Sequence, residues 1–457
     1  MIKSKRVRGT NGTGQFRDGK DGKLVEASVG AIILWLIGLA FSHFVAYSVS
    51  EAAGVACLGV VGILHSAVQF WQQGVNRISA GAIFAFGTAL FVFFPALYSY
   101  YEPFDVPSHY LLLACSAALL SQVVTFGILI PLTARPSFER SSFRTSDRLT
   151  VATWVLFLGN ILFYGAVASG LTLPFGTREL AFTLLVLFAV CASRSTISAL
   201  VSGLICLAFF LLYTEFMFTG LGRLVLGSLG IAVAASYAPR WPDRRVKLAI
   251  IVLSVPVLTY MIIWRAEYTA DIRGVENAEG SGIASVIAPL IRFAQLIQWD
   301  QSGMIEYAGL GTLFASAVVW IPRALWPNKP VGFGAELAEL FTPHLVQFGQ
   351  SDAASVWGES YYSFGLAGLI LSPFFIGAII IGLDGLMKLS EAREVPVTVY
   401  AALLVLASGL VDLAWNGTFT YVSRAGLKLV ILAALTLVTY RVILPAWEPS
   451  RPDPTRK

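Results

Sequence analysis

Residues 28–48 read SVGAIILWLIGLAFSHFVAYS, a stretch without Asp, Glu, Lys or Arg. An apolar run of about 20 residues is long enough for one helix to cross the hydrocarbon core of a bilayer. Similar runs recur along the 457 residues, so that 56% of the chain is hydrophobic, 13% is charged and the mean hydropathy is +0.72. Because a soluble domain carries about 25% charged residues, the sequence predicts an all-α integral membrane protein.

The apolar runs predict about twelve transmembrane helices, the first nine within residues 28–264 and the last three within residues 362–443. A polar segment, residues 265–361, separates the two groups. Residues 1–27 are basic and rich in glycine, which predicts a disordered cytoplasmic N-terminus, and residues 444–457 are expected to form a cytoplasmic tail. The expected spans are residues 28–48, 51–71, 79–98, 109–132, 150–170, 178–193, 196–213, 216–237, 248–264, 362–386, 397–415 and 425–443.

The basic residues between the spans predict the orientation of the chain. Cytoplasmic connections of membrane proteins carry an excess of Lys and Arg. If the N-terminus is inside, such residues gather in the cytoplasmic connections, for example at 135–148 and 240–247, whereas the outer connection 100–108 has none. We therefore expect both termini in the cytoplasm and the polar segment outside, which in a bacterium is the periplasmic face of the inner membrane. The net charge of +5 then reflects orientation and not nucleic-acid binding.

Two apolar pieces interrupt the polar segment. Residues 283–298, IASVIAPLIRFAQLIQ, place Ile287, Leu290 and Phe293 on one helical face, which predicts a helix lying in the membrane interface. Residues 308–321 are too short to cross comfortably and are followed by prolines, which end a helix. We expect the rest of the segment to be one large periplasmic loop that carries any chemistry.

The first candidate binding site is the segment 322–330, PRALWPNKP. A turn framed by prolines would present Arg323, Trp326 and Lys329 near the outer interface. Arg grips phosphate oxygens with two N–H groups, Lys adds a point charge, and Trp stacks on sugar rings. Trp with basic residues also forms interfacial anchors, so the segment alone leaves both interpretations open.

Glu359 and His344 are the candidate general bases. Glu359 lies in the segment 358–368, GESYYSFGLAG, where the chain is expected to re-enter the membrane. A carboxylate there can take a proton from a sugar hydroxyl, or it can simply cap a helix whose dipole stabilises it. His344 is the only histidine of the polar segment, and a lone histidine is more often structural than catalytic.

Arg223 and Arg424 stand in or beside apolar runs. A charge at membrane depth is costly and usually faces a partner or a wet cavity. Arg223 could pair with the nearby Glu215, or it could bind an anionic lipid headgroup such as a diphosphate. Arg424, together with Asp412 and Trp415, raises the same question near the outer ends of the last two spans.

The sequence predicts no metal and no other cofactor. No cluster of His, Cys, Asp and Glu has metal-ligand spacing, and no glycine-rich phosphate loop with its lysine is present. The four cysteines lie in apolar runs without a CxxC pair, so we expect no disulfide.

Taken together, these motifs resemble one family. The chain combines many spans and a large late outer segment with PRxxWPxKP at 322–330 and GExYxxFGxxG at 358–368, and it enters the eighth span with Gly-Leu-Gly-Arg223. This pattern resembles the oligosaccharide repeat-unit polymerases, the Wzy-type O-antigen and exopolysaccharide polymerases. The resemblance implies a GT-C-like glycosyltransferase that moves a glycan from undecaprenyl diphosphate onto another lipid-linked repeat unit at the periplasmic face.

The resemblance also implies roles for individual residues. Arginines would neutralise the diphosphate leaving group, and a carboxylate or histidine would activate the acceptor hydroxyl. The expected partners are the lipid-linked oligosaccharide, the bilayer, a chain-length regulator and a flippase. The expected site consists of Arg223, Arg292 and Arg323 for diphosphate, Glu359 or His344 as base, Trp326, Tyr361 and Tyr362 for sugar, and Lys329 and Arg424 as further substrate-binding residues.

Two other functions fit parts of this pattern. An O-antigen ligase shares the topology and the donor but transfers the glycan to lipid A–core. A transporter or glycolipid flippase should line the mid-membrane with polar residues and often contains an inverted repeat, and the sequence shows neither. The segment 322–330 favours the polymerase.

Overall fold

The protein is an all-α, multi-pass membrane protein. In its described part, every element is a helix, and eight helices are long and apolar enough to cross a membrane. The computed structural model describes residues 18–73, 78–133, 146–170, 176–218, 223–238, 240–241, 244–252, 254, 259, 263, 283–346, 351–392 and 396–438.

The first part of the bundle contains two spans that change helix type midway. Pro95 and Pro131 lie just after the starts of α4 and α6, and since proline lacks a backbone N–H, each span passes through a π-helical turn. The helices of this part are α1 (Asp18–Ser48), α2 (Glu51–Gln72), α3 (Ala80–Thr88), η1 (Ala89–Phe93), α4 (Phe94–Tyr98), α5 (Ser108–Val124), η2 (Thr125–Leu129), α6 (Ile130–Thr133), α7 (Asp147–Ala168), α8 (Thr177–Ser193), α9 (Ala199–Met217) and α10 (Arg223–Ser236).

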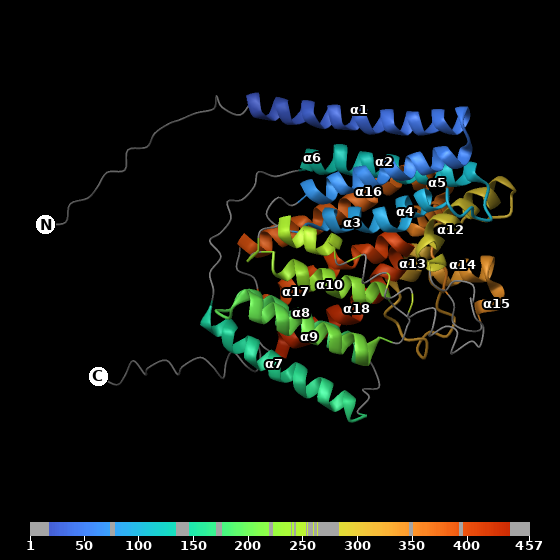
Figure 1. Cartoon of the computed structure of the whole chain (residues 1–457). Helices are drawn as coiled ribbons and strands as arrows, with labels where there is room; N and C mark the ends of the chain where they lie inside the picture. Colours follow the sequence, from blue (N-terminus) through green and yellow to red (C-terminus); the bar gives the residue numbers. More distant parts are fainter. Residues whose placement is uncertain are drawn as a thin grey trace, which may run out of the picture.

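The second part adds an outer layer and the last membrane helices. Four of its helices, α12 to α15, gather at one end of the bundle, on the right in Figure 1. The elements are α12 (Ala284–Gln301), α13 (Gly311–Ala317), α14 (Phe333–Phe341), α15 (Pro343–Val346), α16 (Ser355–Ala392), α17 (Val397–Ser408) and α18 (Leu410–Val438).

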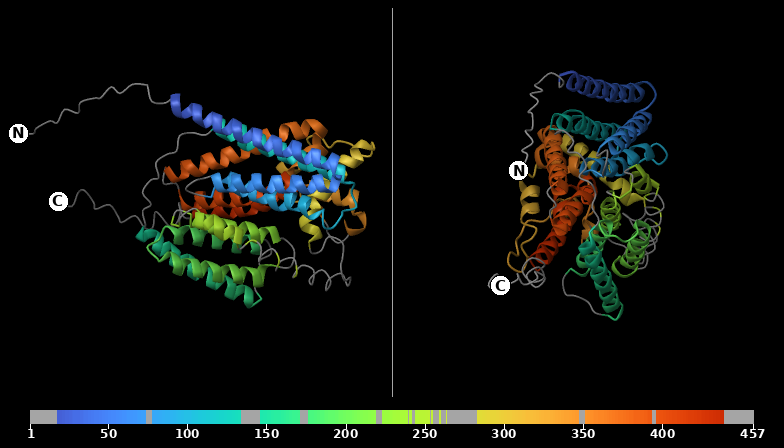
Figure 2. Two further views of the ribbon diagram at one scale, coloured as in Figure 1. Left: turned by 45° about the horizontal axis from the view of Figure 1, so that its top comes forward. Right: turned by 90° about the vertical axis from the view of Figure 1, so that its left-hand side faces the viewer.

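The helices lie side by side, with α1 and α7 on opposite flanks in all three views (Figures 1 and 2). The buried share of each span depends on whether it lies at a flank or inside the bundle. The span Ala80–Tyr98 is 72% buried, whereas the span in α1 is only 6% buried and that in α7 only 17%. The flanking helices therefore turn apolar side chains outward, as expected of surfaces that face lipid.

The number of predicted spans agrees only in part with the number of described helices. Seven of the eight long helices coincide with expected spans, whereas the eighth, α18, begins at Leu410 and not at the expected position 425. Three further expected spans contain the shorter helices α8, α10 and α17, of 17, 14 and 12 residues. The expected span 248–264 lies largely outside the described residues, so the total of twelve stays a prediction.

Several predicted boundaries were wrong. α1 begins at Asp18, so residues 18–27 are helical and not disordered, while residues 1–17 and 444–457 lie outside the described residues. α16 begins at Ser355 and not at 362. The expected span 397–415 ends at Ser408, because the chain turns at Gly409 and starts α18 at Leu410.

The prediction of an interfacial helix at 283–298 was right about the helix and wrong about its surroundings. α12 covers this segment, but Leu290 and Phe293 are fully buried. α12 packs against α5 and α16. Protein therefore covers the apolar face that an interfacial helix would turn to lipid.

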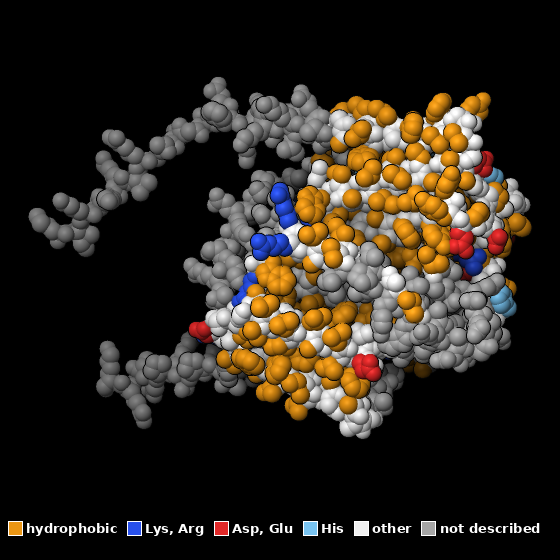
Figure 3. All heavy atoms as spheres, viewed as in Figure 1, with side chains coloured by type: hydrophobic (Ala, Val, Ile, Leu, Met, Phe, Trp, Pro, Cys, Tyr) orange, Lys and Arg blue, Asp and Glu red, His pale blue; other side chains and the backbone are white. Residues whose placement is uncertain are grey.

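Charge is distributed unevenly along the bundle. In Figure 3 most of the visible Lys and Arg side chains lie at the left-hand end, which also shows an acidic side chain, whereas most of the visible acidic side chains and histidine lie toward the right-hand end, where α12 to α15 are and where a basic side chain is also visible. At the basic end Lys247 donates to the carbonyl oxygens of Trp71 and Gln73, at 3.2 and 2.7 Å, and so caps the end of α2. This distribution agrees with the predicted orientation, in which the outer layer is periplasmic; the orientation itself stays a prediction.

Candidate functional site

Two membrane helices are broken beneath the outer layer. α16 has a non-helical residue at Gly365, with φ 59° and ψ −139°. α18 is broken at Asn416 and Gly417, and Gly417 has φ 75°. Both glycines adopt positive φ, which side chains with a Cβ rarely tolerate. A break of this kind frees backbone groups that a continuous helix would pair.

The outer layer pairs the groups that the break in α16 frees. The N–H groups of Ala308 and Gly309 donate to the carbonyl oxygens of Tyr362 and Ser363, at 3.0 and 2.9 Å. The hydroxyl of Thr312 lies 2.9 Å from that of Ser363. The segment before α13 is thus hydrogen-bonded into α16 and is not a free loop.

Glu359 pairs the groups that the break in α18 frees. Its carboxylate accepts from the N–H of Thr418 at 2.6 Å and from the Thr418 hydroxyl at 2.7 Å, and the residue is 3% exposed. Gly417 allows this approach, because a Cβ there would lie 2.2 Å from Glu359 Oε2. The carboxylate therefore caps the second half of α18, where the helix dipole favours a negative charge.

This geometry bears on the predicted role of Glu359 as a base. Both carboxylate oxygens already accept hydrogen bonds within the protein, which is the cap interpretation that the sequence left open. The catalytic role stays a prediction. Asn416 Oδ1, at the break itself, is buried and has no hydrogen-bond partner among the described residues, so the break retains unused hydrogen-bonding capacity.

The two tyrosines predicted to contact sugar are held by acidic residues. The Tyr361 hydroxyl donates to Asp300 at 2.6 Å, and the Tyr307 hydroxyl donates to the other oxygen of Asp300 at 2.8 Å. This hydrogen bond raises the pKa of Tyr307. Tyr362 hydrogen-bonds Glu336, whose pKa is raised chiefly by burial. Tyr361 is 8% exposed, so it offers little surface to a sugar in this arrangement.

Arg292 is neutralised by a neighbouring acid. Its guanidinium lies 3.0 Å from the Asp352 carboxylate and 2.7 Å from Gln295 Oε1. It also lies over the Phe341 ring, 5.0 Å from the centroid. The predicted diphosphate contact of Arg292 would have to compete with this pair.

Arg323 and Lys329 hold their own turn together. Arg323 donates to the carbonyl oxygens of Pro327 and Lys329, at 3.3 and 3.1 Å. Lys329 donates in turn to two carbonyl oxygens in the segment 319–321. Trp326 packs edge-on against a phenylalanine, with ring centroids 6.2 Å apart. The described contacts of the turn are therefore local, and both the anchor and the substrate contacts stay predictions.

Two other predicted residues are only partly described. His344 is exposed on the short helix α15. Arg223 is the first residue of α10, and its side chain lies outside the described residues. No described contact joins either of them to Glu359.

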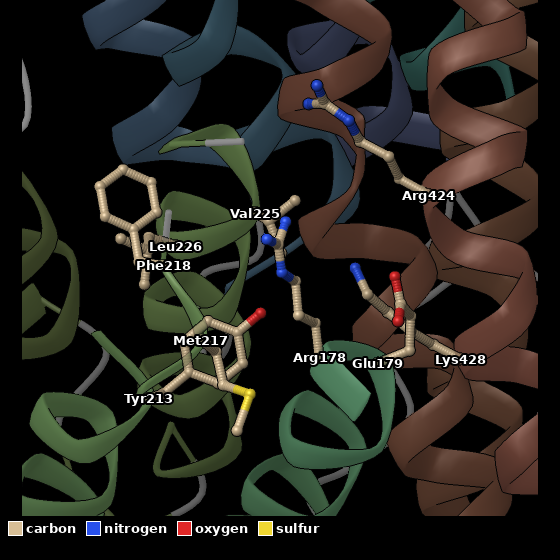
Figure 4. Close-up of a pocket in the computed structure, with 9 residues that line it drawn as sticks. All are labelled: Arg178, Glu179, Tyr213, Met217, Phe218, Val225, Leu226, Arg424 and Lys428. Carbon is tan, nitrogen blue, oxygen red and sulfur yellow. The ribbon is translucent and has the colours of Figure 1, made fainter. Parts of the chain in front are cut away.

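Arg424 borders a cavity that involves residues the sequence interpretation did not select. Its guanidinium pairs with Asp412 at 2.5 Å and lies 5.3 Å from the centroid of the Trp415 ring. Beside it, Arg178 and Lys428 also line the cavity (Figure 4). A signal for Lys428 was available, since a cation four residues after Arg424 shares its helix face and stands in an apolar run.

No group of three or more potential metal ligands occurs among the described residues. The chain matches no protein-family model, no curated protein and no solved structure. The likeness to repeat-unit polymerases therefore rests on the motifs alone.

Proposed function

We propose that the protein is a membrane glycosyltransferase that polymerises undecaprenyl-diphosphate-linked oligosaccharide repeat units into O-antigen or exopolysaccharide, at the periplasmic face of a bacterial inner membrane. The motif resemblance suggests this function. The observation that supports it best is the attachment of the outer layer to the breaks in α16 and α18, through backbone hydrogen bonds and the contact of Ser316 with Thr418 at 3.1 Å.

Such a reaction takes place at a defined depth of the membrane. The polyprenyl tail of the donor stays in the bilayer and the sugar stays in water, so the reacting bond lies at the headgroup level. Reacting groups have to be held there by rigid elements. Residues attached to the broken membrane helices, such as Glu359 and Tyr361, meet this requirement better than residues on a free loop.

The proposed step is a substitution at the anomeric carbon. The acceptor hydroxyl oxygen forms the new glycosidic bond, the bond between the anomeric carbon and the phosphate oxygen breaks, and undecaprenyl diphosphate leaves. A carboxylate or histidine takes the hydroxyl proton, and cations stabilise the leaving diphosphate. Because both substrates are glycolipids, a flippase that delivers them and a chain-length regulator are the expected partners.

Glycolipid transport is the second candidate. Secondary transporters use broken helices whose half-helix ends face the substrate near the middle of the membrane, and α16 and α18 are both broken. Against this, Glu359 of the same chain already fills the half-helix end in α18. An O-antigen ligase remains the alternative within glycan chemistry.

Deletion of the gene tests the proposal. The surface polysaccharide and the undecaprenyl-linked pool would be extracted and separated on a sizing gel, with the intact gene on a plasmid as control. Single repeat units in place of a ladder would support polymerisation. Full-length polymer accumulating on undecaprenyl diphosphate would indicate a ligase, and repeat units trapped on the cytoplasmic side would indicate a flippase. An unchanged glycan pattern would refute all three.

A further inference from the structure

A cavity lies between α8, α9, α10 and α18 (Figure 4). Its volume is about 80 Å³, which is smaller than whole small-molecule sites, so it can hold only part of a ligand. Its walls differ in character. Apolar side chains of α9 and α10 form one side, whereas Arg178 and Glu179 of α8 and Arg424 and Lys428 of α18 form the other. A site of this kind suits a molecule with one charged and one apolar end.

Lys428 is a buried cation that interacts electrostatically with two acidic residues, Asp412 and Glu179. It is 4% exposed, and its ammonium lies 3.9 Å from the centroid of the Phe182 ring. Burying an ammonium costs several kcal/mol unless an anion or hydrogen bonds compensate it. A cation–π contact recovers only about 2 kcal/mol of this cost when desolvated. An anion in the cavity would add to the compensation that Asp412 and Glu179 give.

The charges around the cavity do not balance. Three cations line it, Arg178, Arg424 and Lys428. Glu179 offsets one of them, and Asp412, the partner of Arg424, offsets another. One net positive charge remains among these five residues.

Two helix ends add to this positive potential. α8 begins at Thr177, and its first turn supplies Arg178 and Glu179 to the cavity. α10 begins at Arg223, and Val225 and Leu226 of its first turn also line the cavity. Helix N-termini carry a partial positive charge and bind anions readily.

We infer that this cavity binds the phosphate headgroup of a lipid, with Lys428 as the principal cation and Arg178 beside it. The Tyr213 hydroxyl, which is turned toward Arg178 in Figure 4, is the nearest neutral donor. The apolar wall takes the first part of the lipid chain. That the phosphate belongs to the glycolipid donor rests on the proposed function, whereas the binding itself does not.

This inference moves the phosphate site away from the expected residues. Of the three arginines predicted to bind diphosphate, Arg292 is paired with Asp352 and Arg323 holds its own turn. The third, Arg223, starts the helix that borders the cavity. The cavity therefore keeps one predicted element and replaces the other two with Arg178 and Lys428.

Ligand binding to the purified full-length protein in detergent tests the inference. The probes are undecaprenyl diphosphate, undecaprenol and inorganic pyrophosphate. Thermal unfolding is followed with a maleimide dye, which reports the buried free cysteines Cys115, Cys191 and Cys206 as they become exposed. The shift in melting temperature is measured against probe concentration to give a Kd.

The variants are Lys428→Met, which keeps the length of the side chain and removes its charge, and Lys388→Met as the matched control on an exposed lysine of α16. We expect undecaprenyl diphosphate to stabilise the wild type and the control equally. Lys428→Met should raise the melting temperature of the unliganded protein, because the cations around the cavity outnumber the acidic residues and removal of one buried cation relieves repulsion with Arg424. It should also raise the Kd at least ~10-fold, because it removes a charge-assisted contact. Lys428→Arg should retain binding.

Three results would overturn the inference. Unchanged affinity in Lys428→Met would show that the cavity is not the site. Equal stabilisation by pyrophosphate and by undecaprenyl diphosphate would show that the ligand is a free anion and not a lipid. No stabilisation by any probe would show that the cavity binds none of these ligands. Binding that is lost in Lys428→Met, together with an unchanged glycan pattern on gene deletion, would support the lipid site and refute the polymerase.

Discussion

The cap formed by Glu359 leads to a prediction about two substitutions at this position. Glu359→Gln should fold nearly as the wild type, whereas Glu359→Ala should be clearly destabilised. In the glutamine variant the amide oxygen can accept from the Thr418 N–H and the amide nitrogen can donate to the Thr418 hydroxyl, so both contacts of 2.6 and 2.7 Å remain. Only the charge is lost.

The magnitudes follow from these contacts. Loss of charge assistance costs about 1 kcal/mol per hydrogen bond, and part of this is offset because a neutral amide is easier to bury than a carboxylate. We expect a net cost of about 1 kcal/mol for Glu359→Gln. Glu359→Ala leaves the buried Thr418 N–H unpaired, about 2 kcal/mol, and removes packed atoms worth about 2 kcal/mol more. With an unfolding entropy near 2.1 cal/mol/K per residue, these costs lower the melting temperature by roughly 1 °C and roughly 4 °C.

Thermal unfolding with the maleimide dye measures the difference. Thr418→Val is the companion variant, because it removes one donor of the cap and leaves the carboxylate in place; we expect it to fall between the two. Thr436→Val is the matched control, since its hydroxyl only bonds Leu432 within the same helix. Equal destabilisation by glutamine and alanine would refute the cap geometry, as would a wild-type melting temperature for the alanine variant.

The same variants separate a cap from a base. A general base contributes about 10² to 10⁴ in rate, so a catalytic Glu359 predicts loss of polymer in Glu359→Gln despite its near-normal melting temperature. A cap predicts that polymer yield follows stability across the series. The hydrogen bonds to Thr418 favour the second outcome.

Other contacts lead to further predictions. Burial raises the pKa of Glu336, so the folded protein binds this proton more tightly than the unfolded chain does. The resulting contribution to the free energy of unfolding is fully present below the unfolded pKa and is lost as pH rises through the folded pKa. The melting temperature of the wild type relative to Glu336→Gln should therefore rise as pH is lowered from about 7 to about 5, and a constant difference would contradict this. Asp412→Asn leaves the Arg424 guanidinium, which is 25% exposed, without its partner. We expect a cost of about 3 kcal/mol, largely recovered when Arg424→Gln is added; no recovery would refute the pairing. Gly426→Ala would place a Cβ 1.3 Å from the Trp320 ring, so limited trypsin cleavage of the outer layer should become faster, and an unchanged cleavage rate would show that this contact does not hold the layer.

The sequence was sufficient to predict the membrane helices but not their breaks. Apolar runs of the required length identify a span without knowledge of its neighbours. A break depends on a distant partner. A Cβ at Gly365 would lie 2.7 Å from the Tyr307 ring, so glycine is needed there. The local sequence does not predict that contact. For the same reason the apolar face of α12 could not be assigned to lipid or to protein.

The sequence indicated several residues of the candidate site but not the contacts that these residues make. Glu359 was selected with both its interpretations, and the described hydrogen bonds match the cap. Arg323 and Lys329 were selected for phosphate, yet their contacts with nearby carbonyl oxygens are local and agree with the anchor that was also considered. Arg178 was not selected, because its neighbours in the cavity come from α9, α10 and α18, which only the folded structure brings together.

The outer layer and the broken helices depend on each other. The N–H groups of Ala308 and Gly309 have their partners only because α16 is broken, and the break is affordable in a membrane only because those N–H groups pair the freed carbonyls. The same holds for α18 and Glu359. Lys428 lies about three turns beyond the break in α18. The cap formed by Glu359 therefore orients the half-helix that carries Lys428 into the cavity. The outer layer, which contains the polymerase-like segment 322–330, and the cavity proposed to bind a lipid phosphate are therefore connected through the second half of α18.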